Sequence, residues 1–105
     1  MVTVTFQKSD TASAVELILN VRLKAVGSHA GDKDFKQLAL GVPVNFDIAP
    51  GVYRLNIIGF LSSGEEPFTL TLGNALFGSN GGVGGSVSLT ATGPVYKNSL
   101  KVKVS

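Results

Sequence analysis

Residues 15–25 have the sequence VELILNVRLKA, and the pattern within it indicates the class of fold. Every second residue from Val15 to Ala25 is apolar, and the residues between them are polar or charged except for Ile18. Successive side chains of a β-strand point to opposite faces, so a strand here would have one apolar face and one mostly polar face. On a helix the same apolar residues would scatter around the axis. We therefore predict a half-buried strand.

The same alternation recurs along the chain and predicts six further strands. Turn-forming sequences separate them, among them Ala49-Pro50-Gly51, Ser62-Ser63-Gly64 and Gly93-Pro94. No long window has helical periodicity, so the chain is expected to be all-β. The seven predicted strands span residues 2–7, 14–26, 37–48, 52–60, 67–72, 86–91 and 99–104.

Seven short strands with one apolar face each need two layers to bury those faces. We predict a single domain over residues 1–105, an antiparallel β-sandwich of immunoglobulin-like or C2-like type, with a small β-barrel as the alternative. Pro43 lacks a backbone donor, so the third strand is expected to lie at an edge or to bulge near Gly41. The apolar phase is unchanged across Pro43, which predicts a kink rather than a reversal. Such a break also lets one long strand pass from one sheet to the other at a corner of the sandwich. The order of the strands does not follow from alternation.

The composition excludes several classes of protein. The 105 residues are 44% hydrophobic and 15% charged, which favours a folded domain over a disordered chain. The absence of cysteine excludes a disulfide framework and a thiol nucleophile, and a net charge of +2 is too small to indicate nucleic-acid binding. No apolar run reaches the about 18 residues of a transmembrane helix, and residues 1–10 lack the features of a signal peptide. The localisation is open between the cytoplasm and export by a signal-independent route.

The segment GNALFGSNGGVGG, residues 73–85, contains six glycines. A phosphate-binding glycine-rich loop needs a helix after it and usually a Lys-Ser/Thr pair, and neither is present. Asn80-Gly81 favours a hairpin turn, with Ala75–Phe77 extending the fifth strand past a bulge at Gly73. The alternative is a mobile loop that contacts a protein partner or a second copy of the chain. The predicted partner-binding residues are Leu76, Phe77 and Val83.

Polar residues gather in three connections between predicted strands. In an antiparallel arrangement successive connections alternate between the two ends of the molecule, so residues 27–36, 61–66 and 92–98 are expected to share one end. That end is predicted to bind a glycan, a peptide or a partner protein. Its carboxylates could supply oxygen ligands for Ca²⁺, but no calcium-loop spacing is present, and we predict no metal site. The predicted ligand-binding residues are Asp32, Asp34, Glu65, Glu66 and Tyr96.

Nothing in the sequence indicates catalysis or a cofactor. His29 is the only histidine, and its neighbours Ser28, Asp32 and Asp34 lie in one polar loop, where triad residue types are expected by chance. Arg22 and Lys24, and likewise Lys101 and Lys103, would form a modest cationic patch if their strands paired. Lysines on strands more often prevent edge-to-edge association.

The sequence therefore favours a non-catalytic binding module that uses loops at one end of a β-sandwich. A first alternative is a structural subunit of a self-assembling, secretion, tail or fibre-type assembly, suggested by low charge and by apolar residues in the glycine-rich segment. A second alternative is a Ca²⁺-dependent binder of membranes or glycans. The oligomeric state is open, with self-association possible.

Overall fold

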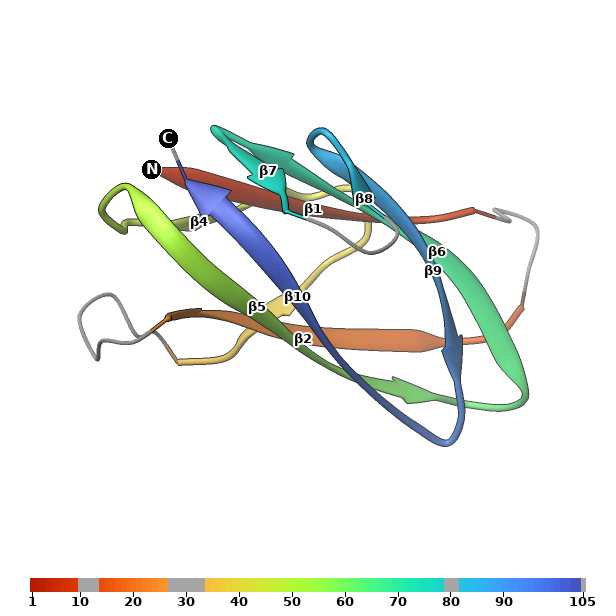
Figure 1. Ribbon diagram of the computed structural model, residues 1–105. Coiled ribbons are helices and arrows are strands. Elements are labelled where there is room, and N and C mark those ends of the chain that lie inside the picture. The colour runs from red at the N-terminus through yellow and green to blue at the C-terminus, as the bar shows by residue number, and fades with distance from the viewer. Residues whose placement is uncertain (10–13, 27–33, 79–81, 105) are drawn as a thin grey trace.

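The computed structural model describes residues 1–9, 14–26, 34–78 and 82–104. These residues form two five-stranded sheets. Figure 1 shows that the two sheets face each other. Sheet I contains, in spatial order, β4 (Val44–Phe46), β1 (Val2–Lys8), β6 (Glu65–Gly73), β9 (Ser86–Thr92) and β8 (Gly82–Val83). Sheet II contains β3 (Lys36–Leu38), β2 (Leu17–Ala25), β5 (Gly51–Leu61), β10 (Val95–Val104) and β7 (Ala75–Phe77).

The predicted antiparallel β-sandwich is confirmed. All eight pairings between named strands are antiparallel, and buried residues of both sheets form one hydrophobic cluster between them. Each sheet keeps two edge strands, so the alternative of a closed barrel is wrong. Among the described residues there is no helix, and hence none that could cross a membrane.

The core consists of the residues that the alternation assigned to the apolar faces. In β2, Leu19, Val21 and Leu23 are fully buried, while the residues between them are partly exposed. Phe46 and Phe68 are the largest fully buried side chains and come from sheet I. Burying a large apolar side chain stabilises a fold by about 1.5–3 kcal/mol, so this cluster is the main source of stability.

The predicted third strand is two strands, and the chain reverses between them. Leu40 forms a parallel bridge with Phe6 of β1, whereas β4 pairs with β1 antiparallel. At the reversal the Gly41 N–H donates to the Phe6 carbonyl (2.7 Å), and Gly41 has a φ of 73°, a conformation that glycine adopts without strain. The chain passes from sheet II to sheet I between β3 and β4, but the prediction of a kink without reversal is wrong.

The glycine-rich segment also differs from the prediction. Ala75–Phe77 does not continue β6 in sheet I but forms β7, which pairs with β10 in sheet II. Within the described part of this segment, a tight turn lies at Gly84-Gly85, between β8 and β9, and Gly84 has a φ of 64°. The turn predicted at Asn80-Gly81 lies outside the described residues. Strands β7 and β8 lie in opposite sheets, so they are not the paired arms of one hairpin.

Candidate functional site

Two of the three connections expected to share an end do so. The Gly93 N–H donates to the Gly64 carbonyl (3.0 Å), and the Leu61 N–H donates to the Pro94 carbonyl (3.0 Å). We call this the loop end of the sandwich. Glu65, one of the predicted ligand-binding residues, is exposed here at the start of β6.

Glu66 is buried, with 2% of its surface exposed, and points between the sheets. Its Oε1 lies 3.6 Å from Lys8 Nζ, which also donates to the Val15 carbonyl (2.7 Å). The pair fills the core at the loop end, where β1, β6 and the start of β2 meet. Through Lys8 the pair joins β6, β1 and the segment just before β2, and the burial of Glu66 leaves little surface for a ligand.

Tyr96 is half-buried and closes the core at the same end. Its ring contacts Phe68 edge to face, with centroids 6.0 Å apart, and Phe68 contacts Phe6 in the same manner at 5.9 Å. Asn98 Nδ2 donates to the Tyr96 hydroxyl (2.8 Å). Such edge-to-face contacts are typical of aromatic packing in cores. Tyr96 thus has a packing role, although part of it faces solvent.

Asp34 lies away from the loop end, which corrects the expected grouping. Ala25 pairs with Tyr53 at the start of β5, so the chain leaves β2 at the opposite end of the sandwich and Asp34 comes just before β3. The expectation failed because the reversal at residues 41–43 changes which connections share an end. Asp32 lies outside the described residues. The described part of the chain contains no group of three His, Cys, Asp or Glu residues that could hold a metal ion.

The predicted partner-binding residues have different surroundings. Leu76 is 52% exposed on the outer face of β7, whereas Phe77 is 6% exposed and belongs to the core. Val83 lies in the two-residue strand β8. Phe77 is therefore unsuited to bind a partner without local unfolding, and Leu76 remains a candidate.

The outer face of sheet II carries the most distinctive chemistry of the molecule. Strand β5 lies between β2 and β10, and its Arg54 pairs with Lys24 on one side and Lys101 on the other. The next row along the strands, Leu23, Leu55 and Leu100, is buried, so Lys24, Arg54 and Lys101 point outward. Lys103 follows two residues after Lys101 on the same face. We call Lys24, Arg54, Lys101 and Lys103 the basic row.

The charges of the chain are divided unequally between the sheets. Seven of the nine Lys and Arg residues lie in the strands of sheet II, and none of the seven acidic residues does. The outer face of sheet I is instead rich in hydroxyl groups, as in the row Thr5, Thr71 and Ser86. The seven cations of sheet II are Arg22, Lys24, Lys36, Arg54, Lys97, Lys101 and Lys103.

The basic row is a destabilising arrangement for the isolated fold. Like charges directly opposite each other on adjacent strands are destabilising. Arg22 and Lys36 lie over aromatic rings, those of Phe35 (4.7 Å) and Phe46 (4.8 Å). In the part of the chain that the structure describes, no ion pair joins the basic row to a carboxylate. Its cations are therefore available to an external anion.

Part of the basic row was predictable from the sequence. Alternation in residues 52–60 places Arg54 outward, as it does Arg22 and Lys24, but alternation does not reveal which strands are neighbours. The cationic patch was therefore expected to be modest. The insertion of β5 between β2 and β10 brings Arg54 into the centre and makes the row continuous.

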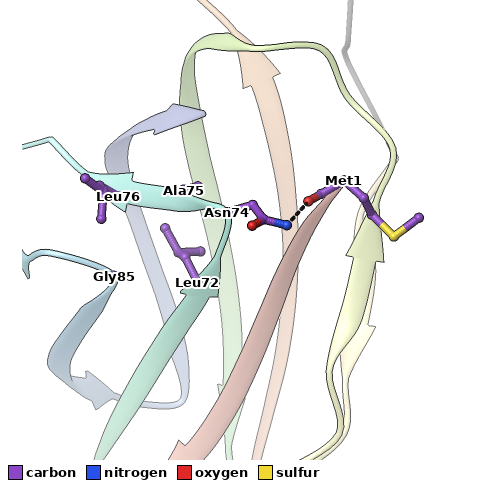
Figure 2. A pocket seen from close by; sticks show the side chains of 6 residues that line it. All are labelled: Met1, Leu72, Asn74, Ala75, Leu76 and Gly85. Carbon is purple, nitrogen blue, oxygen red and sulfur yellow. Dashed lines mark hydrogen bonds between the residues drawn. The ribbon is translucent and has the colours of Figure 1, made fainter. Parts of the chain in front are cut away.

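A hollow of about 570 Å³ lies beside β7, where the chain leaves sheet I for sheet II. Asn74, with a φ of 64°, makes this turn, and its Nδ2 donates to the Met1 carbonyl (3.0 Å), as Figure 2 shows. Leu76 borders the hollow, so this end of the molecule combines exposed apolar groups with the nearby basic row. The residues that line the hollow are Met1, Leu72, Asn74, Ala75, Leu76 and Gly85.

Comparison of the chain with protein-family models, with curated proteins and with solved structures gave no match.

Proposed function

We propose that the chain is a non-catalytic binding module that holds a polyanionic partner on the outer face of sheet II. This proposal keeps the class of function predicted from the sequence and moves its site. Of the five residues predicted for the loop-end site, Glu66 is buried and Asp34 lies elsewhere, whereas the basic row is continuous and exposed.

The observation that carries the proposal is the row Lys24, Arg54 and Lys101. Three like charges in adjacent cross-strand positions oppose folding, and no acidic residue in the strands of sheet II offsets them. Positions where a sequence departs from the arrangement that stabilises its fold are commonly functional. A polyanion removes the repulsion and releases its counterions on binding.

The test is calorimetric binding of heparin, used as a soluble polyanion, at about 50 mM and about 500 mM salt. We expect binding that weakens at the higher salt and falls by about two orders of magnitude in Lys24→Gln/Arg54→Gln/Lys101→Gln, at about 1 kcal/mol for each cation. The matched control is Gln7→Glu/Thr71→Glu/Thr90→Glu, which lowers the net charge equally but on sheet I. Equal losses in the two variants would show that only net charge matters, and the proposed site would be wrong.

The alternative function is that of a structural subunit in an assembly. One observation argues against assembly through edge-to-edge pairing of sheets. The four edge strands β3, β4, β7 and β8 are only two or three residues long. Short edge strands limit pairing between copies of a sheet. Sedimentation at high protein concentration tests the alternative, which predicts self-association that Leu76→Ser weakens.

A further inference from the structure

We infer that the polyanionic partner is an anionic lipid bilayer, contacted by the end of sheet II that carries the basic row. This inference rests on the proposed function and specifies its partner. The contact end is the one where β2 ends, β5 begins and β10 ends, opposite the loop end. Figure 1 shows that β1 also begins there.

Three exposed aliphatic side chains lie next to the basic row at this end. Val52 of β5 pairs with Lys103, which also pairs with Leu76 of β7. The Val26 N–H donates to the Val52 carbonyl (3.1 Å), which extends the row past the end of β2. Val26, Val52 and Leu76 are 54%, 38% and 52% exposed. We call these three residues the apolar row.

The two rows are adjacent. Val26 and Val52 lie two residues from Lys24 and Arg54 along their strands, a separation of about 7 Å. A flat surface that meets this end of the sheet can therefore contact cations and aliphatic side chains together. Lysine stems can lie along apolar material while their ammonium groups remain with polar headgroups.

Lipid accounts for this combination better than a soluble polyanion does. A sulfated or phosphorylated chain would pair with the cations but leave the aliphatic side chains in water. Single-stranded nucleic acid favours aromatic side chains for base stacking, and the apolar row has none. An anionic bilayer supplies charge at its surface and an apolar boundary beneath it.

A protein partner fits the residue types less well. Protein interfaces are enriched in aromatic residues, Met and Arg and depleted in Lys. Here three of the four cations in the basic row are lysines, and the neighbouring apolar residues are aliphatic. An anionic membrane attracts Lys and Arg comparably, because its charge acts over a surface and not through one paired geometry.

The experiment measures binding of the full chain to vesicles of phosphatidylcholine with about one quarter phosphatidylglycerol, and to pure phosphatidylcholine vesicles, in EDTA. Heparin binding is measured beside it. The test variant is Val26→Thr/Val52→Thr/Leu76→Gln. The matched control is Ile18→Thr/Phe60→Gln/Val95→Thr, because these three form an equally exposed cross-strand row at the far end of the same face (44%, 46% and 50%).

We expect the wild type to bind only the anionic vesicles. The apolar-row variant should lose at least about tenfold in vesicle affinity and keep its heparin affinity, since removing apolar contact does not change the charge. The far-row control should bind vesicles as the wild type does. If the triple variant does not fold, Leu76→Gln alone is used, because β7 packs through Ala75 and Phe77 and should fold without Leu76. Its expected loss in vesicle affinity is about threefold.

Unchanged vesicle binding in the apolar-row variant, or an equal loss in the far-row control, would overturn the inference. Heparin binding without vesicle binding by the wild type would also overturn it and leave the proposed function intact. Binding to neither probe would overturn both. Binding that depends on Ca²⁺, and is lost in EDTA, would contradict recognition by the basic row.

Discussion

Lys8 Nζ lies 3.6 Å from Glu66 Oε1, between the two sheets at the loop end of the sandwich. Lys8 follows Val2, Val4 and Phe6 on the inward face of β1, and Glu66 precedes Phe68 on the inward face of β6. The charged pair thus occupies the inward-facing positions of β1 and β6 that lie nearest the loop end. Removing one partner leaves the other charge poorly solvated, whereas replacing both need not.

We therefore expect Lys8→Met to lower the free energy of unfolding by about 2–4 kcal/mol, below the upper limit for buried pairs because Lys8 remains 15% exposed. Lys8→Met/Glu66→Leu should recover most of this loss. Chemical denaturation checks both, with Glu65→Gln at the exposed neighbouring position as the control. A double variant less stable than Lys8→Met would show that the pair does not act as a unit.

Gly41→Ala tests the reversal between β3 and β4. Gly41 has a φ of 73°, and an added Cβ would meet nothing within 4 Å, so strain arises from the backbone alone. We expect a loss of about 1–2 kcal/mol in unfolding free energy, and a smaller loss for Gly41→Asn, which tolerates this conformation better. Equal stability of Gly41→Ala and wild type in urea denaturation would contradict the positive φ.

Leu76 and Phe77 are adjacent but should respond differently to the same change. Phe77→Ser removes a core side chain and should lower unfolding free energy by about 3–5 kcal/mol. Leu76→Ser acts on a side chain that is 52% exposed and should change stability by about 0.5 kcal/mol or less. Thermal melting of the two variants checks this, and similar melting temperatures would mean that β7 is not packed as described.

Arg54→Thr should maintain or raise stability. Arg54 pairs with Lys24 and Lys101, so its removal relieves two like-charge contacts, and Thr suits an exposed strand position. We expect an increase of up to about 1 kcal/mol at low salt, shrinking as salt screens the repulsion. Denaturation at two salt concentrations measures it. A loss exceeding about 1 kcal/mol would assign Arg54 a structural role.

The inward and outward faces of the strands were predictable from the sequence, because the alternation of polar and apolar residues indicates which way each side chain points. The same rule would have placed Glu66 inward, since it shares the phase of Phe68, Leu70 and Leu72. Its carboxylate favoured an exposed ligand site instead, and that preference was misleading. The signal for a buried pair was present in the phase of Lys8 and Glu66.

The chain reversal was not predictable in the same way. Leu38 and Phe46 are both buried and share one phase, so alternation continues across the turn although the direction changes. The phase of the polar and apolar alternation carries no information on the direction of the chain or on which strands are neighbours. The end that holds Asp34, and the position of Arg54 between Lys24 and Lys101, therefore follow only from the three-dimensional pairing.

Binding through the basic row is tested by the salt dependence of heparin binding, compared between wild type and Arg54→Gln. If Arg54 contacts the polyanion, the slope of log affinity against log salt should fall by about one in the variant. Thr71→Glu, with the same change in net charge on sheet I, should keep the wild-type slope. A slope unchanged by Arg54→Gln would contradict binding through the outer face of sheet II.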